Sequence, residues 1–528
     1  MSAMLSTPQE LEDLASRTER SPQVMTTAAA AHDLPALTRR LLDMPGVTFA
    51  DLFGVDERRR HGCFRLHVIW ALDRVHRWLD IEVDLPAGDP HYPALTPLLP
   101  AAGWYERELR DELGIPPDGH PAPSPLRRPA SWPEGHHLLR EDVAWATSVP
   151  RREPIDEEEL PLLPSGPEGV VDYPLGPVRS GVVESGHYTL RTVGEEIVDF
   201  RLQLFFKHRG VEKRAEGLGL SHLALVAERI SGTSAFAHSL ALCQAVEMAA
   251  GCTVPERALQ LRTLFAELER LYNHVGYQAD LCQATGLAVG QAQFEILKER
   301  LLRLNASLAG HRYLFGLNTP GGLSRDLDAG ELASVRQTLH DLQRQVDRLG
   351  SMLTSSASHI DRLESTGILR PEDAAAFGAV GPSGRASGID RDLRRDHPYA
   401  AYAAVSFAVP VLDTGDALAR FRLRLAEIKE SIRIGEQIVD TIHSGPVRAE
   451  VQLPPDGGSG FGWAESPRGE SLHWIALRPD GTAYRYRARP ASFANWQAFP
   501  LAIPGHNILT DFPVIEQSFG LSFAGADR

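Results

Sequence analysis

The chain is poor in cysteine. Its 528 residues include only four cysteines, Cys63, Cys243, Cys252 and Cys282, and no two of them have Cys-x-x-Cys spacing. An iron–sulfur cluster usually needs four thiolates, so we expect this chain alone to hold none. Isolated cysteines of this kind are typical of free, buried thiols in a reducing cytoplasm.

Long apolar runs are also missing. We find no stretch of about 18–20 apolar residues, the length that a membrane-spanning helix requires. The N-terminus lacks the basic and apolar segments of a secretory signal, and the pair Arg39-Arg40 precedes no suitable apolar stretch. We therefore expect a cytoplasmic chain without a membrane span, which partners would hold on the cytoplasmic face of the plasma membrane.

Positive charge is scarce as well. Lys and Arg number 54 against 69 Asp and Glu, which gives a net charge of −15 at pH 7, and no basic block interrupts this balance. Such a composition disfavours nucleic-acid binding. The chain also has no Gly-x-Gly-x-x-Gly fingerprint, so we expect that it does not bind NADH itself.

The patterns that are present predict an α+β protein, beginning with a small α/β domain at residues 33–142. Residues 63–72 predict a strand, and alternating apolar residues predict another over 78–85. Residues 104–114 predict a short helix ended by glycine. Residues 1–32 are polar and alanine-rich and predict a flexible tail. Residues 143–170 are rich in Pro and Glu and predict a linker.

Residues 171–528 predict a second, larger domain with a central helical bundle flanked by β-rich segments. We expect a hairpin over 188–204 and a helical block over about 220–362. One helix should end at Gly251 and the next should begin at Pro255. Apolar stripes at helical spacing in this block are typical of bundle cores rather than of cofactor sites.

Two segments are the best candidates for a functional site. Residues 228–238 contain a Ser-x-x-Ser pair, and residues 521–528 contain a Ser-x-x-Gly pair. Both segments resemble those that hold the metal in the large subunit of group 4 membrane-bound [NiFe] hydrogenases, where each carries Cys-x-x-Cys. The vacated metal-ligand positions here are Ser231, Ser234, Ser522 and Gly525.

The resemblance covers nearly the whole chain after the tail. Residues 105–128 are similar to the signature of the 30-kDa subunit of complex I (NADH–quinone oxidoreductase). From residue 175 the chain resembles the 49-kDa subunit of complex I and, more closely, the large subunit of formate-hydrogenlyase-type hydrogenases. The segments that carry this second likeness include 208–213, 254–257, 385–388 and 444–448. The chain is thus identified as a fusion of the two modules.

The resemblance implies that the familiar nickel–iron site is absent. Nickel and low-valent iron need soft thiolate ligands, and a neutral serine hydroxyl is a poor substitute. We expect no metal and no other cofactor on this chain, and a [4Fe-4S] cluster in a partner small subunit. Ferredoxin-like subunits and antiporter-like membrane subunits are the other implied partners. From the residues alone, Ser231 and Ser234 could equally cap the helix that follows them.

Quinone reduction is the other chemistry that the resemblance raises. In complex I, a His, a Tyr and an Asp surround the quinone headgroup. The matching positions here fall near Val183, Gly232 and Ala284, whose side chains offer no hydrogen bond to a headgroup carbonyl. The hydroxyls of residues 231–234 could donate instead.

Three polar residues are candidates for proton transfer. By resemblance, Glu212 matches the glutamate that relays protons beside the metal in hydrogenases, and Arg385 and Asp392 match a polar set near the same cavity. A buried carboxylate there could have a raised pKa and shuttle protons. Alternatively, Glu212 forms a structural ion pair with Arg209 or Lys213.

Three functions stay open from the sequence. The chain could be an electron- and proton-transfer subunit of a membrane-associated complex of the NADH–quinone oxidoreductase or hydrogenase type. It could also be a pseudo-enzyme that kept the fold and interfaces as a structural and coupling subunit, or a hydrogenase with unfamiliar ligands. In each case we interpret His238 and His274 as helix-packing histidines.

Overall fold

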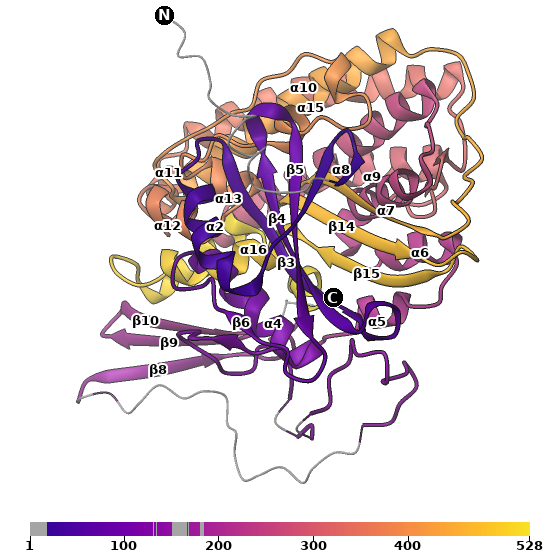
Figure 1. The fold of residues 1–528 in the computed structure, drawn as a ribbon. Coiled ribbons are helices and arrows are strands. Elements are labelled where there is room, and N and C mark those ends of the chain that lie inside the picture. Colours follow the sequence, from indigo (N-terminus) through magenta and orange to yellow (C-terminus); the bar gives the residue numbers. More distant parts are fainter. Residues whose placement is uncertain (1–17, 130, 134, 150–165, 167, 180–183) are drawn as a thin grey trace, which may run out of the picture. The chain divides into compact units, whose positions relative to one another are not determined.

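The computed structural model (Figure 1) describes residues 18–129, 131–133, 135–149, 166, 168–179 and 184–528. It divides into two compact units, residues 1–158 and residues 159–528, and the division lies within the predicted linker. Residues 150–165 of that linker, and Val183, lie outside the described residues.

The first unit is built on one mixed sheet. Its helices and strands are β1 (Thr18–Ser21), β2 (Val24–Ala28), α2 (Leu34–Leu42), β3 (Val47–Glu57), α3 (Arg58–His61), β4 (Cys63–Leu72), β5 (Arg77–Pro86), β6 (Tyr92–Pro93), α4 (Gly103–Leu113) and β7 (Pro117–Asp118). Five strands lie in the order β1-β2-β5-β4-β3, with β2 parallel to β5 and the other neighbours antiparallel. β4 spans Cys63–Leu72 and is buried from Leu66 onward, so the predicted strand over 63–72 is confirmed.

The prediction of a flexible tail over residues 1–32 is wrong from residue 18 onward. β1 pairs with β2, and β2 lies beside β5, with Val24 next to Trp78. Residues 24–27 are all buried. A strand buried on both faces shows no alternation of apolar and polar residues, and alternation is the signal by which the strand over 78–85 was predicted.

The second unit combines long helices with two small sheets and short β elements. Its strands are β8 (Val170–Leu175), β9 (His187–Val193), β10 (Glu196–Gln203), β11 (Asn318–Thr319), β12 (Gly322–Leu323), β13 (Gly458–Ser466), β14 (Gly469–Leu477) and β15 (Ala483–Arg489). Its helices are α5 (Val211–Ala215), α6 (Leu220–Ala227), α7 (Ala235–Ala250), α8 (Glu256–Ala284), α9 (Ala288–Ala309), α10 (Ala329–Thr354), α11 (Ala357–Leu363), α12 (Pro371–Ala376), α13 (Gly381–Arg385), α14 (Leu393–Asp396), α15 (Ala417–Thr441), α16 (Ala491–Ala498), α17 (Phe512–Phe519) and α18 (Phe523–Asp527).

The predicted helical bundle is confirmed. α8 packs against α9 and α15, and α10 packs against α15 and α9. Gly251 ends α7 with a φ of 60°, a conformation that glycine adopts without strain, and Pro255 directly precedes α8. The hairpin of β9 and β10 is also present. The mixture of bundle and sheets makes the chain an α+β protein.

Helix α7 lies against the sheet β13-β14-β15 at unusually close range (Figure 1). Gly460 and Gly462 alternate along β13 and face the helix. A Cβ atom on either glycine would overlap a helix carbonyl oxygen, that of Ala245 or that of Ala241 respectively. Only glycine lets the two backbones come this near. The sheet therefore fixes the position of α7 and of the Ser-x-x-Ser segment that leads into it.

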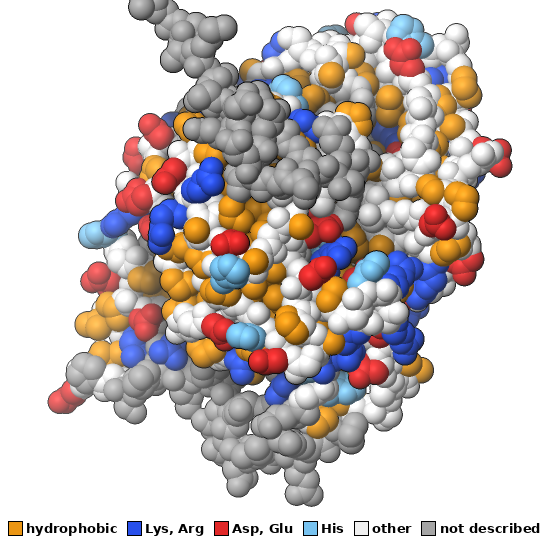
Figure 2. Space-filling model, viewed as in Figure 1, with side chains coloured by type: hydrophobic (Ala, Val, Ile, Leu, Met, Phe, Trp, Pro, Cys, Tyr) orange, Lys and Arg blue, Asp and Glu red, His pale blue; other side chains and the backbone are white. Residues whose placement is uncertain are grey.

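No helix among the described residues is long and apolar enough to cross a membrane. Acidic and basic side chains both occur on the molecular face drawn in Figure 2.

Candidate functional site

The structure brings the two motif segments together. Ser231 Oγ lies 3.2 Å from Ser522 Oγ, although 291 residues separate them in the chain. The backbone N–H of Gly525 donates to Ser522 Oγ at 3.0 Å. Ser234 ends the 3-10 turn Gly232–Ser234 that follows Ser231. All four positions are buried, as a closed site requires.

The alternative that Ser231 and Ser234 cap α7 is wrong, because neither side chain accepts a hydrogen bond from the helix start. Glu269 of α8 caps the helix instead. Its two carboxylate oxygens accept from the backbone N–H groups of Phe236 and Ala237 at 2.8 and 3.0 Å. Burial raises the pKa of Glu269 to about 8, although both hydrogen bonds act to lower it.

We expect Glu269 to make the protein less stable as pH rises. The folded chain holds this proton up to a pKa of about 8, whereas the ordinary value is 4.5. Between those values only the folded state binds the proton. The contribution of Glu269 to the free energy of unfolding is therefore fully present below about pH 4.5 and is lost as the pH rises toward 8. Between about pH 5 and 8.5, the unfolding midpoint of Glu269→Gln should change less with pH than that of the parent protein. Equal slopes would contradict the raised pKa, and Glu256→Gln, at the exposed start of α8, is the matched control.

Arg468 holds the first segment in place, and no pattern in the sequence indicates this role. It lies in the turn between β13 and β14. Its NH1 donates to Thr233 Oγ1 at 2.8 Å and to Ser234 Oγ at 3.2 Å, while its Nε donates to the carbonyl of Gly520 at 2.9 Å. Arg468 thus ties the Ser-x-x-Ser segment to the chain just before Ser522. A fixed positive charge at Ser234 also opposes the binding of a metal cation there.

Arg209 braces both segments through their backbones. Its guanidinium donates to the carbonyl oxygens of Arg229 and Ile230 at 2.6 and 2.9 Å, and to that of Ala524 at 2.9 Å. These carbonyls lie just before Ser231 and just after Ser522. One side chain therefore sets the separation of the two motifs.

Glu212 forms an ion pair, but not with either partner considered from the sequence. Its Oε1 accepts from Arg528 NH1 at 2.8 Å, and both side chains are buried. Lys213 pairs with Glu216 at 2.8 Å, and Arg209 binds backbone carbonyls. The pair of Glu212 and Arg528 anchors the end of the second motif segment on α5.

Arg385 and Asp392 lie in a separate buried group of charges. Arg385 NH1 is 3.3 Å from Asp392 Oδ2, and the same guanidinium pairs with Glu427 at 2.7 Å and with Glu465 at 2.8 Å. Arg394 pairs with Asp392 at 2.7 Å. Among the described residues, no hydrogen bond or ion pair links Glu212 to Arg385 or Asp392, so the three predicted relay residues do not form one cluster.

The two acids of this buried group titrate differently. Burial raises the pKa of Glu465 to about 7, helped by the charge of Asp392 and opposed by that of Arg385. Burial acts in the same direction on Asp392, but the charges of Arg394 and Arg385 outweigh it and hold the pKa of Asp392 below its ordinary value. Asp392 therefore stays ionised, while Glu465 can gain or lose a proton near neutral pH.

His274 supports this group as a neutral donor. Its Nε2 lies 2.7 Å from Glu427 Oε2, between α8 and α15. Burial lowers the pKa of His274 to about 4, even though the hydrogen bond with Glu427 and its charge raise it. A neutral imidazole that bonds a carboxylate between two helices fits the helix-packing interpretation.

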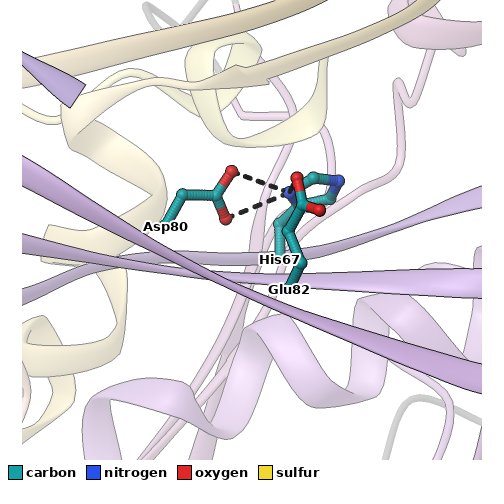
Figure 3. Close-up of side chains that lie close together, drawn as sticks. All are labelled: His67, Asp80 and Glu82. Atoms are coloured by element: carbon teal, nitrogen blue, oxygen red, sulfur yellow. Dashed lines mark hydrogen bonds and ion pairs between the residues drawn. The ribbon is translucent and has the colours of Figure 1, made fainter. Parts of the chain in front are cut away.

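A group of possible metal ligands lies on the sheet of the first unit, away from every predicted site residue in sequence. His67, Asp80 and Glu82 project from β4 and β5 (Figure 3). His67 Nδ1 already lies 3.0 Å from both Asp80 carboxylate oxygens, and Arg65 is 3.4 Å from Glu82. These contacts describe an ion-pair cluster, so we assign no metal to it.

The positions matched to the hydrogenase ligands do not fit a nickel–iron centre. Three of them carry hydroxyls, two of those hydroxyls bond each other, and the third accepts from Arg468. The described positions matched to the quinone-binding residues of complex I also lack hydrogen-bonding side chains. Gly232 is exposed, with no atom within 4 Å of where a Cβ would lie, and Ala284 is the last residue of α8.

Comparisons with known proteins show which family has this architecture. Residues 27–149 match the family described as respiratory-chain NADH dehydrogenase, 30 Kd subunit, and residues 292–528 match the 49 Kd subunit of the same enzyme. Formate hydrogenlyase subunit 5 of Escherichia coli (strain K12) is 33% identical over 96% of this chain and 89% of its own length. Hydrogenase-4 component G of the same strain is 31% identical over the same shares, 96% and 89%.

One further relative shares the fusion, and a solved structure shares the fold of most of the chain. The fused C/D polypeptide of NADH-quinone oxidoreductase from Rhodopseudomonas palustris (strain BisB18) is 30% identical over 89% of this chain and 90% of its length. A chain of the archaeal membrane-bound sulfane sulfur reductase superposes with a TM-score of 0.64 at 28% identity, covering 68% of this chain and 99% of that one. The protein therefore belongs to the family of large subunits in which a 30-kDa-type domain is fused to a 49-kDa-type domain, shared by complex I and formate-hydrogenlyase-type hydrogenases.

Proposed function

We propose that the chain is the large subunit of a membrane-associated oxidoreductase complex of the complex I or hydrogenase type, taking part in electron transfer and proton coupling without a nickel–iron site. One observation carries the proposal. The two motif segments meet where Ser231 bonds Ser522, the Ser522 hydroxyl also accepts from Gly525, and Arg468 donates to Ser234. The scaffold is retained while its donor atoms suit hydrogen bonding rather than soft metals.

The relatives support a place in such a complex. Their names refer to formate hydrogenlyase, hydrogenase-4, NADH-quinone oxidoreductase and an archaeal respiratory membrane complex. We propose the same kind of partners here: a small subunit with a [4Fe-4S] cluster, ferredoxin-like subunits and antiporter-like membrane subunits. The chain would sit on the cytoplasmic face of the membrane.

Proton coupling would use the buried charges of the second unit. Glu465 can take up or release a proton near pH 7, while Arg385 keeps its neighbours Asp392 and Glu427 ionised. A negative charge that arrives on a nearby redox group would favour uptake of that proton. Glu212, the other predicted proton carrier, lies beside the motif segments, where it pairs with Arg528.

A structural and coupling subunit without chemistry is the second candidate. The hydroxyls of Ser231, Ser234 and Ser522 all have protein partners, and a site that satisfies itself needs no ligand. This candidate predicts the same complex and the same partners but no turnover.

Metal analysis of the native complex tests the proposal. The complex is purified from membranes by an N-terminal tag on this chain, because Asp527 and Arg528 are buried. We expect iron from a cluster-bearing partner and no nickel, with a nickel-containing hydrogenase prepared alongside as the control. Nickel near one atom per complex would overturn the proposal. If the purified complex contains neither iron nor the small subunit, the result would favour the structural candidate.

A further inference from the structure

Arg468 keeps one terminal nitrogen without a hydrogen bond in the described part of the chain. Its Nε donates to the Gly520 carbonyl, and its NH1 donates to Thr233 Oγ1 and Ser234 Oγ. Among the described residues, NH2 has no acceptor, and no carboxylate forms an ion pair with this guanidinium. A guanidinium carries several N–H donors and a full positive charge, and both suit an oxyanion. Arg468 therefore has a donor and a charge to offer to a ligand.

Thr233 and Ser234 each have a hydroxyl hydrogen that is not used within the described residues. Both hydroxyl oxygens accept from Arg468, but neither hydroxyl donates to a described residue. A hydroxyl that accepts one hydrogen bond still has its own hydrogen to give. Ser234 is 2% exposed, so its hydrogen has little solvent to bond instead. Because both oxygens bond the same nitrogen, the two hydroxyls and the NH2 group of Arg468 lie beside one another.

A second arginine adds to the positive charge at this place. Arg468 and Arg424 both lie over the Tyr277 ring, 5.4 and 4.7 Å from its centre, and neither has a carboxylate partner among the described residues. Burial lowers the pKa of Arg424 to about 10, even though the charge of Glu427 acts to raise it. The acid that caps α7, Glu269, is largely protonated at pH 7, because burial raises its pKa to about 8. Buried charges are normally paired, so two cations that share one ring without a carboxylate favour a bound anion.

The first motif segment is open to solvent at Gly232. This glycine is exposed, a Cβ on it would meet no atom within 4 Å, and Thr233 beside it is half-buried. The hydroxyls of the second segment are a poorer place for an anion. Glu184 Oε1 lies 3.4 Å from Ser522 Oγ, and its negative charge would repel a second one. The donors on the open side of the first segment are therefore the ones that an anion would reach.

We propose that Thr233, Ser234 and Arg468 bind a small oxyanion, such as a carboxylate, in the site that has lost its metal ligands. Arg468 NH2 and the two hydroxyls donate to the anion, and the guanidinium balances its charge. The proposal rests on one part of the proposed function, the absence of a nickel–iron centre. A carboxylate side chain of a partner subunit has the same chemistry. A free ion is favoured because Ser234, at 2% exposure, lies deeper than a side chain attached to another chain readily reaches.

Thermal unfolding of the full chain in sodium acetate tests the proposal. Acetate replaces chloride stepwise, so that the ionic strength stays constant. A ligand that binds only the folded state raises the unfolding midpoint, and we expect a rise that levels off as the site fills. In Arg468→Gln, the acetate concentration that gives half of this rise should increase about 10- to 100-fold, because a charge-assisted hydrogen bond and its charge are lost.

Two further variants separate anion binding from a loss of structure. Ser234→Ala removes one donor and leaves the bonds of Arg468 to Thr233 and Gly520 in place, so it should fold as the parent does and need about 2- to 10-fold more acetate. Arg478→Gln is the matched control. Arg478 is also half-buried and also donates to a threonine hydroxyl and a backbone carbonyl. This control should respond to acetate as the parent does.

A rise that never levels off, or one that is equal in the parent, Ser234→Ala and Arg468→Gln, would show only a general salt effect and would overturn the anion site. If Arg468→Gln does not fold, Ser234→Ala decides. Saturable binding by the full chain that is lost in the purified, nickel-free complex would overturn it in favour of a partner's carboxylate. Nickel in the complex would remove the proposed function and the anion site together, whereas failed binding in nickel-free protein removes the anion site alone.

Discussion

Gly462→Val is expected to detach helix α7 from strand β13. A Cβ at this position would overlap the carbonyl oxygen of Ala241 and also crowd the backbone nitrogen of Ala245. Helix backbone cannot yield as a flexible side chain does, so the strand and the helix must separate. Overpacking of a core costs about 1–3 kcal/mol, and a clash between a side chain and helix backbone belongs at the upper end or beyond. We expect a lower unfolding midpoint and faster hydrogen exchange over residues 235–250.

The same substitution tests whether the sheet positions the candidate site. α7 carries His238 and begins directly after Ser234, so a displaced helix should also break the 3.0 Å contact between His238 and His473. Gly88→Val is the matched control, because Gly88 is exposed and a Cβ there meets no atom within 4 Å. Equal midpoints and equal exchange in the two variants would show that β13 tolerates a side chain facing α7.

The parts of the fold that the sequence predicted are those with a local signal. The end of β5 shows the predicted alternation, with Val83 and Leu85 buried and Asp84 exposed. α7 ends at Gly251 because a left-handed residue stops a helix. β2 shows no such signal, since residues 24–27, Val-Met-Thr-Thr, are all buried and do not alternate between apolar and polar side chains. Strands of that kind are found only through their neighbours.

The candidate site was predicted in its positions but not in its supports. Resemblance placed Ser231 and Ser522 in one site, and the structure brings them within 3.2 Å. The residues that hold the site come from elsewhere in the chain: Glu269 reaches α7 from α8, and Arg468 comes from a turn between two strands. A long-range hydrogen bond leaves no spacing or composition signal, so no pattern within one segment could identify these partners. The roles of Glu212, Arg385 and Asp392 as proton carriers stay predictions.

Arg385→Ala is expected to have the largest effect on stability of any charge removal in the second unit. Arg385 is fully buried and is the shared cation of Asp392, Glu427 and Glu465. Without it, these carboxylates still carry the free-energy cost of burial, and they lose much of the attraction to a positive charge that offsets this cost. Breaking one buried ion pair from one side costs about 3–5 kcal/mol, so the free energy of unfolding should fall by at least that amount. Denaturant unfolding of the full chain measures it.

A cavity left by the lost side chain would also destabilise the protein, and pH separates the two causes. If uncompensated charge is responsible, the deficit of Arg385→Ala should shrink as pH falls, because the carboxyls can then take up protons and become neutral. A cavity costs the same at every pH. Arg395→Ala is the matched control: this arginine pairs with Asp390 and Asp396 at the surface, where such pairs contribute about 0–1 kcal/mol. A deficit for Arg385→Ala that does not change between pH 7 and about pH 5 would show that the buried carboxyls do not depend on Arg385 for their charge.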